Sequence, residues 1–211
     1  MSQRVTIALL TVLSFAAAAP SNANVIITTP ADLATLYTMT DFPADPRADD
    51  SAVTSVASPL GGSIEFWSEG EAAPLAMTLD KNSGWFPAAF GEVYKTSVEW
   101  VELILPANTV AFSFNVGASG NGTGWVEGFD AGGNSAYQAF SLSATNTPGF
   151  GFASTDRCGS ISKIIVEPWE WGIGNFAISQ GSCTTVPEPG TVELLVTGLL
   201  GLIALRRRRV F

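Results

Sequence analysis

Two apolar segments, one at each end of the chain, leave only the residues between them to form a folded domain. Near the N-terminus, Arg4 precedes the uncharged stretch Val5 to Ala19, and small residues follow at Ser21-Asn22-Ala23. This order is typical of a signal peptide read by signal peptidase. We expect cleavage after Ala23, because Pro20 disfavours a cut just before it. The signal segment therefore contributes nothing to the fold.

The C-terminal segment has the composition of a short membrane anchor. Val192 to Leu205 is an apolar run of 14 residues. As a helix it would be about 21 Å long, against about 30 Å for the hydrocarbon core of a bilayer. The basic cluster that follows belongs on the cytoplasmic side by the positive-inside rule, and it consists of Arg206, Arg207, Arg208 and Arg209. Such a marginal span suits a temporary anchor.

The triplet Pro187-Glu188-Pro189 stands directly in front of this anchor. A Pro-Glu-Pro triplet, a short apolar helix and an arginine cluster, in that order, resemble the PEP-CTERM family of exported bacterial proteins. The resemblance implies that an exosortase-type membrane protease recognises and cleaves the tail, in a bacterium that makes an extracellular polymeric matrix. Glu193 stands where the family usually has an apolar or small residue, and it weakens the span. The alternative is an ordinary C-terminal anchor that is never processed.

These signals divide the chain into a signal peptide (1–23), a domain (24–185) and a sorting tail (186–211). Residues 24–186 carry 17 Asp or Glu against five Lys or Arg, a net charge of −12. Such a surface repels nucleic acid and anionic lipids, and it is compatible with divalent cations and neutral polysaccharides. The chain contains no histidine. The commonest general base, the commonest zinc ligand and any Ser–His or Cys–His pair are therefore excluded.

The domain sequence predicts β-structure. Residues 110–116 alternate between large apolar side chains and small or polar ones, which is typical of a strand with one buried face. Val98 to Leu105 is apolar on both faces, as a central strand would be. We expect these two strands to form a hairpin around Pro106-Ala107-Asn108.

Turn clusters such as Gly132-Gly133-Asn134 and Thr147-Pro148-Gly149 separate the other candidate strands at the spacing of an all-β sandwich. Only Pro30 to Thr40 has helical character. The sequence therefore predicts a single antiparallel β-sandwich of jelly-roll type. Further strands are expected at Ser63 to Trp67, Leu75 to Leu79, Trp125 to Phe129, Ala136 to Leu142, Phe150 to Ser154, Ser160 to Glu167 and Asn175 to Ser179.

The order of elements after residue 98 resembles that of small carbohydrate-binding-module-like jelly rolls. The stretches that carry this resemblance are LPANTVAFSFNV, WVEGFDAGGNSAYQAFSL, GFGFASTDRCGSISKIIV and GIGNFAIS. The resemblance implies a fold more than a function, because a jelly roll hosts many unrelated activities. It also implies that a structural calcium ion is compatible with the domain, although the sequence identifies no ligands for one. No other cofactor is expected.

The two cysteines, Cys158 and Cys183, both lie in the exported region. In an oxidising compartment we expect a disulfide, and the alternative is two free thiols. If the strands at 160–167 and 175–179 form an antiparallel hairpin, Cys158 faces Cys183 with the Cα atoms about 5.5 Å apart, which suits a disulfide. If consecutive strands enter opposite sheets, the bond would instead join the two sheets at one end.

Two tryptophans, Trp169 and Trp171, are predicted to lie in the turn between the last two strands. Exposed indoles there would form a candidate platform for sugar rings. The alternative is that they fold over the end of the sandwich and close its core.

Three further groups of residues invite functional hypotheses. An acidic cluster could coordinate calcium, but a solvated acidic loop is the better interpretation. A glycine-rich run superficially resembles a phosphate cradle, but no lysine or helix follows, so we expect a flexible hairpin loop. Strand-borne acids could serve in glycoside hydrolysis, but spacing alone identifies no pair. The acidic cluster is Asp41, Asp45, Asp49 and Asp50. The glycine-rich run is Gly117, Gly120, Gly122 and Gly124, and the strand-borne acids are Glu99, Glu102 and Glu127.

The sequence therefore predicts an exported, exosortase-sorted, non-catalytic protein of the cell surface or extracellular matrix. The first alternative is a polysaccharide-binding module, and the second is a glycan-active hydrolase. A surface groove lined by Trp169 or Trp171 would favour the first alternative, whereas a closed, featureless surface would favour a structural role.

Overall fold

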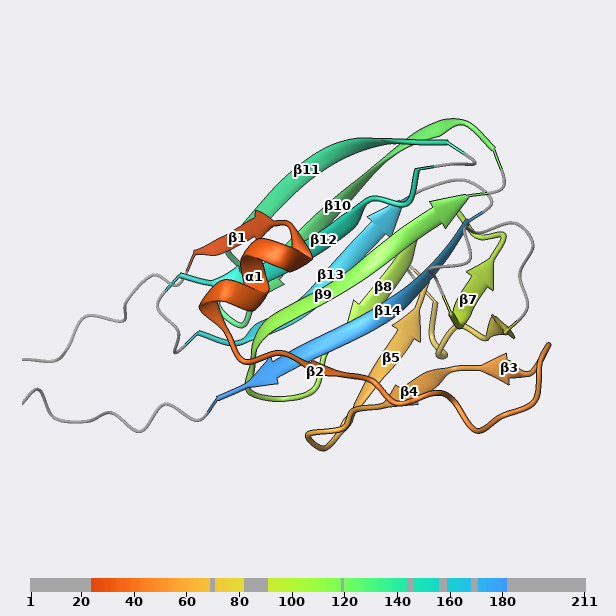
Figure 1. The fold of residues 1–211 in the computed structure, drawn as a ribbon, viewed down its shortest axis with the longest axis horizontal. Coiled ribbons are helices and arrows are strands. Elements are labelled where there is room, and N and C mark those ends of the chain that lie inside the picture. Colours follow the sequence, from red (N-terminus) through yellow and green to blue (C-terminus); the bar gives the residue numbers. More distant parts are fainter. Residues whose placement is uncertain are drawn as a thin grey trace, which may run out of the picture.

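The computed structural model describes residues 24–68, 71–81, 91–118, 120–143, 146–155, 159–167 and 171–181. These residues form two antiparallel β-sheets and one short helix (Figure 1). The all-β prediction is confirmed in this coarse form. Because the described residues end at Gly181, the predicted anchor at Val192 to Leu205 lies outside them. Within the described part, no helix is long and apolar enough to cross a membrane.

The larger sheet has eight strands among the described residues. In spatial order they are β1 (Val25–Thr28), β12 (Gly149–Ser154), β9 (Thr109–Ala118), β14 (Trp171–Gln180), β7 (Val93–Thr96), β6 (Met77–Asp80) and β3 (Ala52–Val53), with β2 (Thr40–Asp41) pairing with β14 beside this path. The smaller sheet has six strands in this part of the chain. They are β11 (Ser135–Leu142), β10 (Gly122–Asp130), β13 (Ile161–Glu167), β8 (Val101–Ile104), β5 (Ser63–Trp67) and β4 (Ser55–Ala57).

The inward side chains of both sheets form one hydrophobic core. Aromatic rings connect the sheets across it: Phe66 of β5 lies 5.6 Å from Tyr94 of β7, and Phe140 of β11 lies 4.9 Å from Phe150 of β12, between ring centroids. Gly128 of β10 faces Phe152 of β12, where an added Cβ would lie only 2.4 Å from the ring atom Cδ1. The missing side chain therefore allows the sheets to approach closely at this point.

Helix α1 (Pro30–Leu36) covers part of the outer face of the larger sheet, over β9 and β12 (Figure 1). Its first turn is well specified, because Pro30 occupies the start of the helix and the Thr29 hydroxyl accepts the Asp32 N–H at 3.1 Å. Leu33 is fully buried against Ala111 of β9 and a neighbouring alanine of β12. The predicted helix is confirmed, but it ends earlier than expected.

This helix also changes the expectation for β9. The alternation at 110–116 predicted one buried face, yet Ala111 and Ser113 are buried as well as the phenylalanines. The strand is central, and α1 covers its second face. The central placement predicted for the strand at Val98 to Leu105 is confirmed in β8, which lies between β13 and β5. The strand covers only Val101–Ile104, however, and alternate residues are buried, so it has one buried face rather than two.

Two predicted hairpins are wrong, because in each case the consecutive strands lie in different sheets. The chain passes from β8 in the smaller sheet to β9 in the larger one, so Pro106-Ala107-Asn108 is a connection between sheets. The glycine-rich segment likewise connects β9 with β10, and Gly117, Gly122 and Gly124 belong to those strands. For the last two strands, where the sequence left a hairpin and a passage between sheets open, the structure has the passage. Accordingly, β13 pairs with β10 and β8, whereas β14 pairs with β9, β7 and β2.

Candidate functional site

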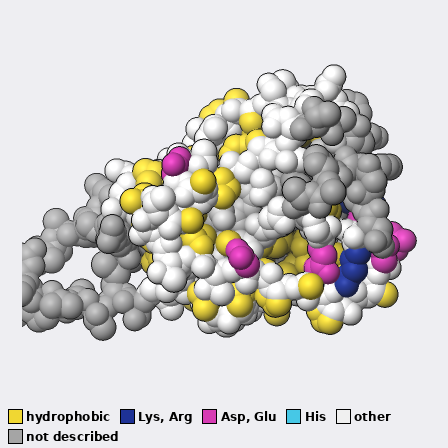
Figure 2. Space-filling model, in the orientation of Figure 1, with side chains coloured by type: hydrophobic (Ala, Val, Ile, Leu, Met, Phe, Trp, Pro, Cys, Tyr) yellow, Lys and Arg dark blue, Asp and Glu magenta, His cyan; other side chains and the backbone are white. Residues whose placement is uncertain are grey.

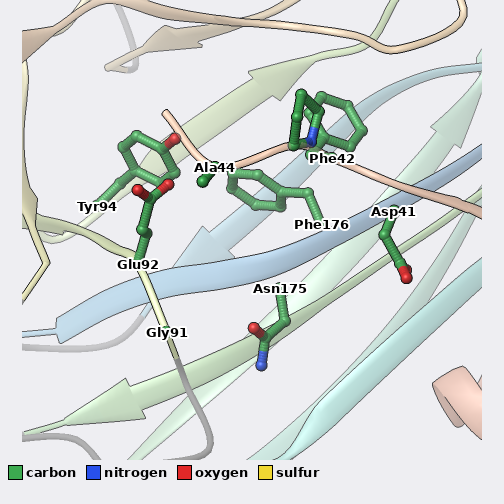
Figure 3. A pocket seen from close by; sticks show the side chains of 9 residues that line it. Asp41, Phe42, Ala44, Gly91, Glu92, Tyr94, Asn175 and Phe176 are labelled. Atoms are coloured by element: carbon green, nitrogen blue, oxygen red, sulfur yellow. The ribbon is translucent and has the colours of Figure 1, made fainter. Parts of the chain in front are cut away.

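A bulge in β14 opens a hollow on the surface of the larger sheet. The pairing of β14 with β9 shifts register between Gly174 and Ala177, and Asn175 has a φ of 53°. On the other edge of β14, β7 pairs as far as Gly174 and β2 pairs from Ala177. The bulge therefore lies where one partner strand gives way to the other. A hollow of about 480 Å³ is found there, and we call it the bulge hollow (Figure 3).

One wall of the bulge hollow is aromatic. The ring of Phe176 lies 5.5 Å from that of Tyr94 with 14° between their planes, and 5.7 Å from that of Phe42 at 70°. Figure 3 shows these three rings gathered together, while Asp41 and Asn175 point away from them. The rings belong to the core cluster, so their main role is to close the sandwich at the bulge.

An ion-pair network adjoins these rings through the Tyr94 hydroxyl. The Asp45 carboxylate is 1% exposed and accepts hydrogen bonds from Arg47, with Nη2 at 2.6 Å and Nε at 2.8 Å, and from the Tyr94 hydroxyl at 3.1 Å. Lys81 Nζ donates to the Asp45 carbonyl oxygen. Glu92 uses both carboxylate oxygens: Oε2 accepts the Asp45 N–H at 2.6 Å, and Oε1 pairs with Lys81 Nζ at 3.3 Å.

The network shifts the ionisation of its members. The hydrogen bond from the Arg47 side chain lowers the pKa of Asp45 to about 2, although burial acts in the opposite direction. Burial raises the pKa of Tyr94, and the negative charge of Asp45 raises it further. Asp45 is thus a charged acceptor and Tyr94 a neutral donor at ordinary pH. Because Glu92 and Asp45 are both engaged, the network holds the segment around residue 45 against the sheet.

This result corrects the interpretation of the acidic cluster as a solvated loop. Asp41, Asp49 and Asp50 are exposed, but Asp45 is buried and ion-paired. The Asp49 carboxylate accepts the Lys81 N–H at 2.8 Å. No group of three or more Cys, His, Asp or Glu side chains in the described ranges is arranged to hold a metal ion.

The outer face of the smaller sheet carries a second, chemically different surface. Val126 of β10 is fully buried, so its neighbours Trp125 and Glu127 point outward, as the alternation of a strand requires. The cross-strand partner of Glu127 is Tyr137, which is 60% exposed. The Trp125 ring lies 5.6 Å from that of Tyr137 and 5.9 Å from that of Trp100, which directly precedes β8. Three aromatic rings therefore form a continuous strip on this face.

Carboxylates flank this strip. Glu167 of β13 pairs with Trp125, so the two side chains share the outer face. Glu127 lies in the next row, opposite Ile165. A hollow of about 420 Å³ opens beside Trp125, and its lining is Thr123, Gly124, Trp125, Tyr137, Ala139, Phe140, Ser141 and Glu167. We call the surface formed by Trp100, Trp125, Tyr137, Glu127 and Glu167 the aromatic face.

Lys163 of β13 lies beside this surface, and its amine is already engaged. Lys163 pairs with Phe129 on the outer face, and its Nζ lies 5.0 Å from the centroid of that ring. The same Nζ donates to Glu102 Oε1 at 3.2 Å. Of the strand-borne acids that the sequence offered, Glu102 therefore holds a lysine, Glu127 lies on the aromatic face, and Glu99 is exposed in the segment before β8.

The predicted sugar platform at Trp171 is wrong. Trp171 is the first residue of β14, is 2% exposed, and donates its indole N–H to the Val98 carbonyl at 3.1 Å. No ring face is left for a ligand, and the core-closing alternative describes this residue. The aromatic residues that are available on the surface, Trp125 and Tyr137, belong to other strands. Their alternation with buried neighbours such as Val126 was the sequence signal that could have identified them.

Several predicted site residues lie outside the described part of the chain. They are Trp169, both cysteines of the expected disulfide (Cys158 and Cys183), the triplet Pro187, Glu188 and Pro189, and the basic cluster Arg206, Arg207, Arg208 and Arg209. The disulfide and the division into signal peptide, domain and tail stay predictions.

Comparison with known protein families identifies the tail directly. Residues 185–209 match the model of the PEP-CTERM protein-sorting motif, so the chain carries this motif where the sequence predicted it. The motif indicates an exported protein with a membrane-anchored precursor that is sorted by an exosortase. A search of curated proteins found no match to the chain.

Proposed function

We propose that this chain is a non-catalytic protein of the cell surface or extracellular matrix, whose domain is a β-sandwich of jelly-roll type. The observation that carries the proposal is the sorting motif at residues 185–209. It begins four residues after Gly181, where the described domain ends. A folded domain followed directly by a sorting signal suits a protein whose task begins after delivery.

The pattern of connections supports the jelly-roll assignment. From β8 to β9, from β9 to β10 and from β13 to β14, the chain changes sheets each time. Repeated passage between two packed antiparallel sheets is the arrangement of Greek-key sandwiches and jelly rolls. Such a domain offers a rigid framework with two large outer faces.

The engaged acids support a non-catalytic role for the places in the fold where they lie. Acid–base catalysis needs a carboxyl group that is free to exchange a proton with a substrate. Beside the bulge hollow, Asp45 and Glu92 are held by Arg47, Lys81 and Tyr94, and on the smaller sheet Glu102 is held by Lys163. These acids act as structural acceptors.

Replacing both Pro187 and Pro189 by Ala tests the sorting part of the proposal. If the triplet is read by a sorting protease, the variant accumulates as a longer, membrane-retained form, whereas the wild-type protein is processed. Gel mobility and mass spectrometry of the envelope fraction measure the difference. Pro43→Ala/Pro46→Ala is the matched control, because both prolines are exposed in the domain. Equal processing of the wild-type protein and the tail variant would refute recognition of the triplet.

A further inference from the structure

The two sheets differ in what covers their outer faces. In the larger sheet, α1 buries Leu33 against Ala111 and Ala153. Over the smaller sheet, the described residues provide no helix, because α1 contacts β9 and β12. The side chains on its outer face are therefore not covered by a helix, and Tyr137 is 60% exposed there. The partly exposed Trp100 and Trp125 lie beside Tyr137, and a contiguous apolar patch on a surface marks a binding site.

The arrangement of the rings indicates the shape of the ligand. Trp100, Trp125 and Tyr137 follow one another at centroid separations of 5.9 and 5.6 Å. Trp125 and Tyr137 stand on strands, which hold side chains more rigidly than loops do, and Trp100 directly precedes a strand. An extended ligand made of repeating units with an apolar face could contact successive rings. Pyranose rings have such a face, formed by their C–H groups, and hydroxyls around the rim.

The charges indicate which polymers fit. Glu127 and Glu167 flank the rings, and ionised carboxylates accept hydrogen bonds from hydroxyl and ammonium donors. The neighbouring Lys163 is bound by Glu102 and lies over Phe129. The whole chain carries a net charge of −9. On the face that Figure 2 shows, basic side chains gather in one place, beside acidic ones. Acidic polymers are therefore repelled.

We propose that the aromatic face binds polysaccharide chains that carry no acidic groups, either neutral or amine-bearing. Sugar rings stack on Trp125 and Tyr137, while Glu127 and Glu167 accept hydrogen bonds from hydroxyl or ammonium groups. An ammonium group would gain further from the negative faces of the indole and phenol rings. This inference goes beyond the sorting function and gives the delivered domain a ligand class.

The test uses the full chain, purified in a detergent without sugar groups and titrated with three hexasaccharides. Tryptophan fluorescence reports binding, because Trp100 and Trp125 are partly exposed in the face. We expect cellohexaose and the glucosamine hexamer to change the fluorescence in a saturable manner, and hexagalacturonate to leave it unchanged. Added salt should weaken binding of the glucosamine hexamer but not of cellohexaose, because only the first of these two expected ligands is charged.

Tyr137→Ala and Trp125→Ala should each weaken binding about tenfold or more, as expected for central aromatic contacts. Leu36→Ala removes an exposed apolar side chain from α1, on the other sheet, and should bind like the wild-type protein. Tyr137 is the more exposed of the two aromatic targets, so its replacement leaves the core intact and keeps the test decisive if Trp125→Ala fails to fold.

Three outcomes would overturn the proposal: no binding of either non-acidic hexamer, tightest binding of hexagalacturonate, or unchanged binding by both aromatic variants. In the last case the rings would only shield the sheet from water. Cleavage of cellohexaose during the titration would overturn the non-catalytic role instead. Because the assay uses purified protein, a failure of tail processing in the cell would leave these results unaffected.

Discussion

Replacing Asp45 by Asn tests the ion-pair network beside the bulge hollow. Asn keeps the shape of the side chain but removes the charge that Arg47 and Tyr94 bind. The pKa of Asp45 falls from 3.8 to about 2 in the fold. Each pKa unit corresponds to about 1.4 kcal/mol, so the ionised carboxylate stabilises the fold by about 2.5 kcal/mol.

The pH dependence follows from the sign of this shift. Because the pKa is lowered in the folded state, the stabilisation is fully present above about pH 4 and is lost as the pH falls toward 2. We therefore expect Asp45→Asn to lower the free energy of unfolding by about 2 to 3 kcal/mol at pH 7. The difference from the wild-type protein should shrink strongly by pH 2.5.

Urea unfolding, followed by tryptophan fluorescence between pH 7 and pH 2.5, measures this difference. Asp41→Asn is the matched control, since Asp41 is an exposed acid in β2, and surface substitutions usually change stability by no more than about 0.5 kcal/mol. If the curves of free energy against pH for Asp45→Asn and the wild-type protein run parallel, the carboxylate does not stabilise the fold through its charge, and the reasoning fails.

Three further predictions concern the sandwich and its helix. Gly128→Val should lower the free energy of unfolding by about 1 to 3 kcal/mol, because the new side chain would clash with Phe152 across the core. An unchanged urea midpoint would contradict the close approach of the sheets. Thr29→Ala should lower the free energy of unfolding by about 1 kcal/mol, because it removes the N-cap of α1. Thermal unfolding followed by circular dichroism measures this change, and an unchanged midpoint would contradict it. Cys158 and Cys183 should resist alkylation until reduced, whereas labelling of both thiols in the exported protein, read by intact mass, would refute the disulfide.

Individual strands were predictable because their signal is local. The alternation of Ser63 to Trp67 gives β5 with the same bounds, and Phe150 to Ser154 lies within one residue of β12. The short strand β7 (Val93–Thr96) was not predicted, since four residues are too few for a clear period. Tertiary pairing with β14 and β6 places this strand.

The assignment of strands to sheets could not be read from the chain. Pro106-Ala107-Asn108 is compatible with a hairpin or with a passage between sheets. The choice depends on tertiary packing, because β8 and β9 lie in different sheets and pack against the same core from opposite sides. The same limit applies to the aromatic residues. Trp171 was predicted to lie in a turn because its neighbours are typical of one, yet it is the first residue of β14 and is buried.

The aromatic face was partly predictable. Trp125 was placed on a strand, and its alternation with apolar Val126 would have directed it outward once Val126 was assigned to the core. The partnership of Trp125 with Tyr137 and Trp100 depends on strand order and register. Asp45 shows the reverse case: a cluster of acids predicts solvent exposure, and one member is buried because Arg47 and Tyr94 satisfy its charge.

The mass of the mature protein at the cell surface tests the central claim most directly. Intact-mass spectrometry of surface-released wild-type protein reads both ends of the chain at once. Export and exosortase sorting predict a form that begins at Asn24 and lacks the cluster Arg206 to Arg209. A surface protein that retains these arginines and ends at Phe211 would contradict sorting by cleavage and leave a permanent anchor in its place.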